Sequence, residues 1–186
     1  MKEDLRVIKS RSAIENAFIS LVEEKGFENV KMIDIAQRAN VNRNTIYLHY
    51  SSKEMIIESL IEEIFSKEVV EFNIGNYLNN RVNKKQIYTL FNNLFAVVNK
   101  NIEFYRIILM DQNLYGYLTL KLKKIKTFIL SSLKPTLKNE LTVEYLVSGV
   151  YGILRDWVVY DKGSVDENIN IITDLVIQNA RHLQRA

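Results

Sequence analysis

Apolar residues recur three and four positions apart along almost the whole sequence, which is the period of amphipathic helices. Strict alternation of apolar and polar residues, the pattern of a β-strand, is hard to find. With six Gly and one Pro among 186 residues, the chain has few of the residues that most often interrupt helices. We therefore predict an all-α protein of about nine helices.

Composition excludes several kinds of chemistry. The chain has no Cys, which excludes disulfides, zinc–cysteine sites and thiol catalysis. Its two histidines, His49 and His182, lie far apart in the sequence and do not suggest a metal site. No apolar run approaches the length of a membrane span, and no signal-peptide pattern opens the chain. We expect a cytoplasmic protein without metal, cofactor or membrane contact, and its net charge of +3 is too small to name a partner.

Turn and capping residues predict where several helices begin and end. Gly26 follows the first apolar stripe and can adopt the left-handed backbone that ends a helix. Asn40, the best residue after Gly for such a backbone, separates two short helices. The pairs Ser51–Glu54 and Ser164–Glu167 have the spacing of capping boxes, so a longer helix is expected to begin at each. The Asn-rich stretch 73–83 is the one predicted loop long enough to separate two parts of the chain.

Residues 32–51 read MIDIAQRANVNRNTIYLHYS and predict two short helices joined by a tight turn, the helix-turn-helix pattern. The outer face of the second helix would carry Arg43, Asn44, Thr45 and Tyr47. Arg and Asn can pair with guanine and adenine edges, and hydroxyl groups can reach phosphate, so this face has the chemistry for DNA contact. Small and apolar residues would form the inner face: Ile35, Ala36, Ala39, Val41 and Ile46.

The longer stretch GFENVKMIDIAQRANVNRNTIYLHYSSKEMI resembles the DNA-binding domain of TetR-family transcriptional regulators. The specific resemblance covers residues 10–60, and Thr45, Tyr47, His49 and Lys53 fall at the family's spacing. The resemblance implies a homodimer that binds double-stranded DNA at a palindromic operator and responds to a small-molecule effector. Its second domain would be a variable, helical regulatory domain, which fits the remaining predicted helices.

The family pattern also implies roles for individual residues. Tyr47 and His49 would approach the DNA backbone, Lys53 would contact a phosphate, and Arg43 and Asn44 would be the residues that read bases. Other interpretations remain open, because Tyr47 could be a packed aromatic, His49 a structural or surface histidine, and Lys53 an ordinary solvated lysine.

Four positions depart from the family pattern. Lys31 stands where a capping Thr is usual, and a lysine can reach phosphate but cannot accept an amide proton. Asn40 replaces the turn Gly and Asn42 replaces the capping Ser, and both substitutions keep the local physics. Tyr50 stands where Phe is common. We expect Lys31 and Asn42 to belong, with the residues named above, to the DNA-binding surface.

The second part of the chain shows no catalytic arrangement, so we predict that the protein is not an enzyme. Aromatic residues on its helices are interpreted mostly as core. The family resemblance implies a ligand pocket between helices, for which we select Tyr105, Tyr117 and Trp157, with Arg155 as an anion partner. Its candidate acids form no recognisable pair with a base: Glu103, Asp111, Asp156 and Asp161.

The last two predicted helices have the pattern of a subunit interface. Small residues would allow helices to approach closely, and the apolar residues around them exceed what one small domain easily covers. The segments NIEFYRIILM and YLVSGVYGILRDWVVYDKG resemble a subgroup of regulatory domains that includes an activator of dihydroxyacetone utilisation. In the TetR family, these two helices pair with their copies in a four-helix dimer contact. The predicted interface residues are Gly149, Gly152, Ile153, Ile172 and Val176.

We divide the sequence into a DNA-binding domain (1–53), a connecting helix (54–72) and a regulatory and dimerisation domain (73–186). The combined interpretation is a ligand-responsive dimeric repressor. An activator and an architectural or cell-division DNA-binding factor of the same fold remain alternatives. A helical enzyme or small-molecule carrier is a further alternative. The lack of an acid–base or metal-binding arrangement argues against the enzyme, and the matched motif argues against the carrier. We interpret the lysine-rich stretch 121–138 as a solvated helix face.

Overall fold

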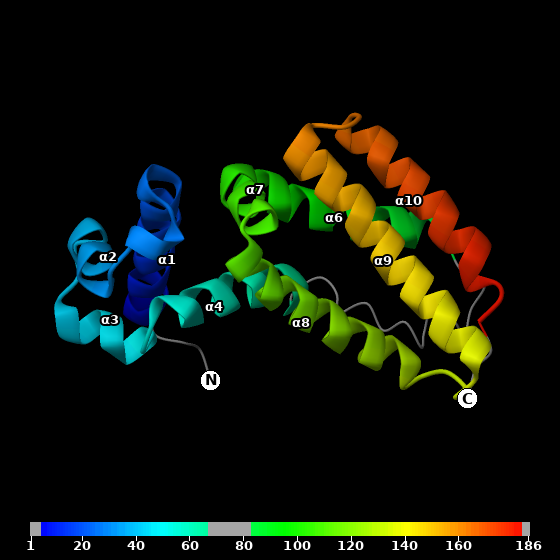
Figure 1. Ribbon diagram of the computed structural model, residues 1–186, viewed down its shortest axis with the longest axis horizontal. Helices are drawn as coiled ribbons and strands as arrows, with labels where there is room; N and C mark the ends of the chain where they lie inside the picture. The colour runs from blue at the N-terminus through cyan, green and yellow to red at the C-terminus, as the bar shows by residue number, and fades with distance from the viewer. Residues whose placement is uncertain (1–4, 67–82, 184–186) are drawn as a thin grey trace. The chain divides into compact units, whose positions relative to one another are not determined.

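The computed structural model describes residues 5–66 and 83–183, which form helices without a β-strand (Figure 1). The prediction of an all-α fold with about nine helices is confirmed within these ranges. Ten helical elements are described: α1 (Leu5–Lys25), the 3-10 turn η1 (Phe27–Asn29), α2 (Met32–Arg38), α3 (Arg43–His49), α4 (Lys53–Ser66), α6 (Lys84–Lys100), α7 (Ile102–Met110), α8 (Gln112–Leu130), α9 (Leu137–Tyr160) and α10 (Val165–Ala180).

The chain divides into two compact units, with the boundary between Glu62 and Glu63 within α4. In the first unit, α1 packs against α2, α3 and η1. The predicted apolar stripe of α1 forms the centre of this core, where Ile14 and Phe18 are fully buried. Ile35 of α2 and Ile46 of α3 are equally buried, so each short helix is fixed by one large side chain on its inner face.

Local turn chemistry ends the helices of the first unit where the sequence predicts. Gly26 has a φ of 76° and Asn40 a φ of 52°, the left-handed region that favours these two residue types. After Gly26, the ring of Phe27 packs edge-on against Phe18 with 6.4 Å between centroids. After Asn40, the Val41 amide donates to the Ala36 carbonyl at 3.0 Å, which closes the turn between α2 and α3.

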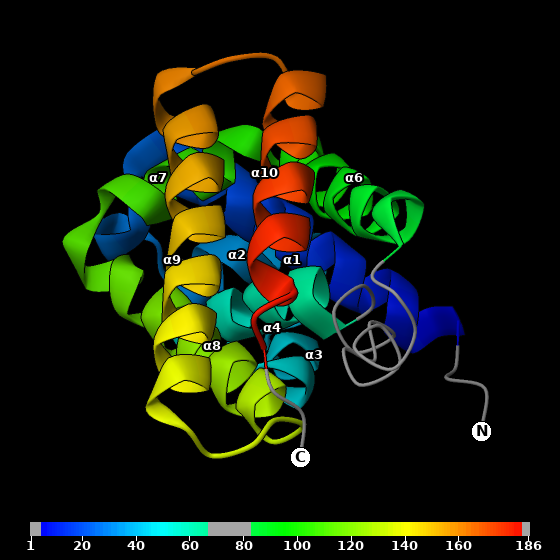
Figure 2. The same cartoon turned by 90° about the vertical axis from the view of Figure 1, so that its right-hand side faces the viewer.

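The second unit is a helical bundle in which α10 packs against α6 and α9, while α7 and α8 pack against α9. Figure 2 shows α9 and α10 side by side and antiparallel, joined by a short loop. The core includes Phe95, Phe104 and Ile108, all fully buried, and the Phe95 and Trp157 rings lie 4.7 Å apart. Large apolar side chains from α6, α7 and α9 therefore contribute to the core of this unit.

The observed helix starts confirm one of the two predicted capping boxes. Ser164 and Glu167 form the predicted capping box of α10: the Ser164 hydroxyl accepts from the Glu167 amide, and the Glu167 carboxylate accepts from the Ser164 amide. Helix α4 begins at Lys53, and the Ser51 hydroxyl contacts the Met55 sulfur, which differs from the capping box predicted there. The predicted break at 73–83 lies outside the described residues, except for Asn83, whose side chain caps α6.

Candidate functional site

One side of α3 is buried and the opposite side is exposed, as a helix that contacts a partner requires. Ile46 is fully buried, whereas Arg43, Asn44 and Tyr47 are exposed. The Asn42 side chain accepts a hydrogen bond from the Asn44 amide at 2.9 Å, which satisfies a free amide at the first turn. The cap, the buried Ile46 and the preceding turn hold this short helix in place and leave its outer face for contact.

The exposed face of α3 carries two rows of side chains, and each row consists of two residues four positions apart. In one row, the guanidinium of Arg43 lies over the ring of Tyr47, 6.0 Å from its centroid, so the two side chains can support one another. In the other row, Asn44 is followed four positions later by Leu48, which is 84% exposed. Leu48 was not among the predicted contacts, although its i+4 spacing from Asn44 was a usable signal. An exposed aliphatic side chain here has the chemistry to contact a thymine methyl group.

Thr45 and His49 lie at the edge of this face. Both are half-buried, and the imidazole of His49 is 6.4 Å from the Tyr50 ring. They are accessible from outside but do not project as Arg43 and Tyr47 do. Their predicted contacts with the DNA backbone remain predictions.

Lys53 is held by the first unit itself. Its ammonium group donates to the Phe27 carbonyl at 2.8 Å and more weakly to the Glu28 carbonyl at 3.4 Å. The same nitrogen lies 4.1 Å from the centroid of the Phe27 ring. An ammonium has three donors, so one hydrogen remains for a phosphate while the others tie α4 to η1. The predicted phosphate contact is therefore compatible with a structural role that the sequence did not indicate.

Lys31 precedes α2 and its side chain makes no capping hydrogen bond. Instead, the Asp34 carboxylate accepts from the Lys31 amide at 3.2 Å and from the Lys25 ammonium at 2.6 Å. The hydrogen bond from Lys25, followed by that from the Lys31 backbone, lowers the pKa of Asp34. The exposed Lys31 side chain therefore remains free of a capping role at the start of the motif.

A polar network that the sequence did not predict surrounds the carboxylate of Glu15. The Tyr50 hydroxyl donates to the buried Glu15 carboxylate at 2.5 Å, and the Ser59 hydroxyl donates to the same oxygen at 3.1 Å. The Arg11 guanidinium donates to Glu15 at 3.1 Å and to Ser59 at 2.6 Å. Burial, with the hydrogen bond to Glu15, raises the pKa of Tyr50 to about 12. The network joins α1, the end of α3 and α4.

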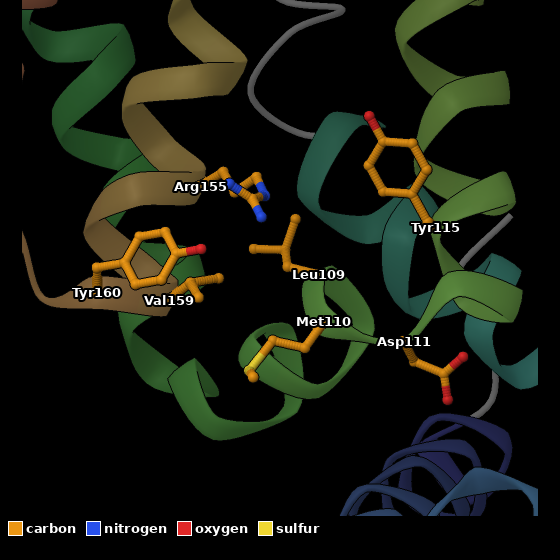
Figure 3. A pocket seen from close by; sticks show the side chains of 7 residues that line it. All are labelled: Leu109, Met110, Asp111, Tyr115, Arg155, Val159 and Tyr160. Atoms are coloured by element: carbon orange, nitrogen blue, oxygen red, sulfur yellow. The ribbon is translucent and has the colours of Figure 1, made fainter.

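The second unit has an open cavity of about 650 Å³ between the ends of α7, α8 and α9. Arg155 lines it, as the predicted pocket requires. Tyr105 and Trp157 do not line it, because both are buried in the core, and the half-buried Tyr117 is also absent from its wall. Of the four predicted pocket residues, Arg155 alone lines this cavity. The lining residues are Leu109, Met110, Asp111, Tyr115, Arg155, Val159 and Tyr160 (Figure 3).

The outer sides of α9 and α10 expose a second surface. A side-chain carbon added at Gly149 or Gly152 would meet no other atom within 4 Å, so neither glycine is needed for packing inside this unit. Ile153 and Val176 are half-buried. Ile172 is 0% exposed, which makes it a core residue and corrects its assignment to the interface. The sequence prediction did not include several exposed apolar residues on these helices, among them Leu141, Tyr145, Ile171 and Leu175.

Within the described ranges, no group of three or more His, Asp or Glu side chains is placed to hold a metal ion. The same ranges contain no helix long and apolar enough to cross a membrane.

Residues 16–60 match the family model described as "Bacterial regulatory proteins, tetR family". The biofilm operon icaADBC HTH-type negative transcriptional regulator IcaR of Staphylococcus epidermidis is 30% identical over 92 residues, which are 50% of this chain and 49% of IcaR. The chain spans about half or less of the length of the curated relatives that it matches.

Solved structures share the fold over most of the chain. SmeT, the repressor of the Stenotrophomonas maltophilia multidrug efflux pump SmeDEF, superimposes with a TM-score of 0.65 over 90% of this chain and 88% of SmeT, at 15% identity. The dihydroxyacetone kinase operon activator DhaS has a TM-score of 0.63 over 94% of this chain and 98% of DhaS, at 17% identity. DhaS represents the subgroup that the sequence of the second part resembles.

These relatives are transcriptional regulators rather than enzymes. The matched segment contains the whole helix-turn-helix motif, and the structure gives this motif a capped, outward-facing second helix. Residues 16–60 therefore match the sequence model of the tetR family of bacterial regulatory proteins, and the chain as a whole has the fold of solved TetR-type transcriptional regulators.

Proposed function

We propose that this chain is a cytoplasmic, dimeric, effector-responsive repressor that holds a palindromic operator with α3 of each copy. The outward face of α3 is the observation that carries the proposal. Its Arg43 and Asn44 have the side chains for paired base contacts, and Tyr47 adds a hydroxyl for phosphate. IcaR, a relative over half of the chain, is a negative transcriptional regulator, which favours repression over activation.

The α9–α10 surface supports the dimer. Leu141 and Tyr145 are each 59% exposed, and they share one side of α9 with Gly149 and Gly152 at helical spacing. Ile171 and Leu175 give α10 a similar exposed row. Contiguous apolar rows on two adjacent helices are typical of protein–protein contacts. A two-fold copy of this surface would cover both rows and bring small residues together where helices cross.

A dimer explains how a short recognition helix achieves specificity. One α3 reaches few bases, whereas two copies on a two-fold axis read two half-sites roughly 34–36 Å apart. We infer that an effector bound in the second unit changes the balance between dimer states that fit this spacing and states that do not. The change in operator affinity is limited by the effector's difference in affinity for the two states.

The test is selection of bound fragments from a genomic DNA library, followed by DNase I footprinting. We expect one or a few promoters with an inverted repeat, protected at two half-sites on one side of the duplex. The double variant Arg43→Ala with Asn44→Ala is the control and should lose this protection. Many scattered sites without a repeat would instead indicate an architectural DNA-binding factor.

A further inference from the structure

The cavity of the second unit combines exposed apolar side chains with a single cation. Among its lining residues, Met110 is 65% exposed and Tyr160 is 63% exposed, although such side chains are usually covered. Leu109 and Val159 extend the apolar wall, and the Tyr115 ring stands on the opposite side in Figure 3. A volume of about 650 Å³ is suited to an organic molecule of moderate size.

Arg155 points into this cavity between the two walls (Figure 3). Its guanidinium carbon lies 5.6 Å from the centroid of the Tyr160 ring, so an aromatic surface adjoins the charge. Its ion pair with the neighbouring Asp156 is long, at 3.7 Å, and Asp156 is also paired with Lys162 at 3.2 Å. The five N–H donors of a guanidinium are therefore only weakly engaged by this acid.

The acid in the cavity wall does not compete for Arg155. The Asp111 carboxylate accepts from the Leu114 amide at the start of α8, at 3.4 Å. Figure 3 shows this carboxylate directed away from the guanidinium. An incoming anion would therefore meet the Arg155 guanidinium beside an apolar surface, while the Asp111 carboxylate lies on the other side of the cavity (Figure 3).

We infer that the cavity binds an amphiphilic organic anion, with a carboxylate or sulfonate on the Arg155 guanidinium and an aromatic or aliphatic body against Tyr160, Met110 and Leu109. The planar guanidinium matches a carboxylate or sulfonate through two parallel hydrogen bonds. The apolar body would cover side chains that are exposed in the unliganded protein. This inference rests on the proposed function in taking the bound anion to be the effector.

The experiment compares two fluorescent probes with the same rings. The first, 8-anilinonaphthalene-1-sulfonate, carries a sulfonate, and the second, N-phenyl-1-naphthylamine, is its neutral counterpart. The folded wild-type protein should bind the anion more tightly, at one site per chain. Arg155→Gln and Arg155→Met should each weaken anion binding about tenfold or more, since a hydrogen bond to a charged group is lost, and should leave the neutral probe little changed. Arg155→Lys should restore part of the affinity.

Two further variants serve as controls. Lys124→Gln removes an exposed lysine of α8 that does not line the cavity and should leave both probes unaffected. Val159→Trp fills the cavity and should exclude both probes, and Leu109→Trp replaces it if the first does not melt cooperatively. Equal binding of the two probes by wild type, or unchanged anion binding by both neutral Arg155 variants, overturns the inference.

Operator binding is measured on the same samples without probe, so that the two proposals fail separately. If the affinity for the anionic probe does not depend on Arg155 but the operator footprint is intact, the inferred ligand class is wrong and the proposed regulatory function is retained. If anion binding depends on Arg155 but the protein binds no operator, the inferred anion site is retained and the proposed function is wrong. Release of the operator by the anionic probe, and not by the neutral one, would link the two.

Discussion

At the scale of single residues, the exposed face of α3 carries two rows of side chains that differ in chemistry. The Arg43 guanidinium lies over the Tyr47 ring, so these two side chains form one row of the exposed face. Asn44 and Leu48 form the neighbouring row, with one amide and one aliphatic side chain. A pair of bases with different major-groove chemistry could therefore be distinguished by these two rows.

Replacing Arg43 should change sequence preference more than it changes total affinity. A good bidentate contact with guanine discriminates by about 1–3 kcal/mol, whereas phosphate contacts hold any sequence. Arg43→Ala should return a relaxed motif from a random DNA library, altered at one position in each half-site. Lys31→Ala is the comparison and should lower affinity for all sequences alike. An unchanged motif with Arg43→Ala would place Arg43 against phosphate or solvent.

Lys53 is predicted to contribute to both DNA binding and structure. Lys53→Met removes the charge but keeps an aliphatic chain over the Phe27 ring. Binding to operator and to unrelated DNA should weaken together, and the slope of log affinity against log salt should become shallower by about one. Fluorescence anisotropy at several salt concentrations measures this slope, with Lys100→Met on α6 as a control. An unchanged slope combined with a lower melting temperature would leave Lys53 with its structural role alone.

At the scale of helices, the network of Glu15, Tyr50, Arg11 and Ser59 links α1, the end of α3 and α4 through side-chain hydrogen bonds. One carboxylate oxygen of Glu15 accepts from the Tyr50 and Ser59 hydroxyls and from Arg11. A buried carboxylate needs such donors, because removal from water is costly without them. The hydroxyl of Tyr50 therefore fixes the end of α3 against α1 and α4.

Tyr50→Phe should destabilise the first unit by about 1.5–3 kcal/mol, the range for a hydrogen bond to a charged group. Amide hydrogen exchange in α1 and α3 should become faster. The chain's single Trp, Trp157, lies in the second unit, so its fluorescence transition in urea should not shift. Tyr88→Phe, which removes an exposed hydroxyl that contacts Asp166, is the matched control. Unchanged exchange in α1 and α3 would contradict a clamping role for Tyr50.

Helix limits and the helix-turn-helix motif could be predicted because they depend on neighbours in the sequence. Gly26, Asn40 and Asn42 each act within one turn of the backbone. The network could not be predicted, since Glu15 and Tyr50 are 35 positions apart and only the packing of α1 on α3 brings them together. The contact of Lys53 with Phe27, 26 positions away, has the same cause.

The second unit shows where a periodic pattern is insufficient. Helix α9 has apolar residues on two sides: Trp157 and Val158 are buried, while Leu141 and Tyr145 are exposed. The sequence marks both sides as apolar but does not say which one faces the interior. The same ambiguity placed Ile172 in the interface and Tyr105 in the pocket, although both are core residues. The resemblance to the DhaS subgroup does not resolve this ambiguity, because it indicates where helices occur but not which side of each helix faces the core.

At the scale of the whole molecule, the proposed dimer can be tested without disturbing either unit. A side-chain carbon at Gly152 would meet nothing within 4 Å, so the protomer leaves room for a side chain at this position. It would nevertheless project from the α9–α10 surface, where a second copy is expected to approach closely. Gly116 on α8 is also free of neighbours within 4 Å and lies away from this surface, which provides a matched control.

Gly152→Leu should therefore weaken self-association while the folded protomer remains stable. Overpacking a close contact costs about 1–3 kcal/mol, and the two-fold axis would impose that cost on both copies. Operator affinity should fall with the dimer, because specific binding needs both recognition helices, although the DNA-contacting residues are unchanged. Gly116→Leu should leave dimerisation and operator binding at wild-type levels, and both variants should melt like the parent.

Sedimentation velocity at micromolar concentration measures the outcome directly. Wild type and Gly116→Leu should sediment as dimers of twice the 21.8 kDa chain mass, and Gly152→Leu should shift toward the monomer. A monomeric wild type would remove the proposed dimer and, with it, the control of operator binding through the spacing of two α3 helices. A dimer that Gly152→Leu leaves intact would place the contact elsewhere on the second unit, away from the exposed rows of α9 and α10.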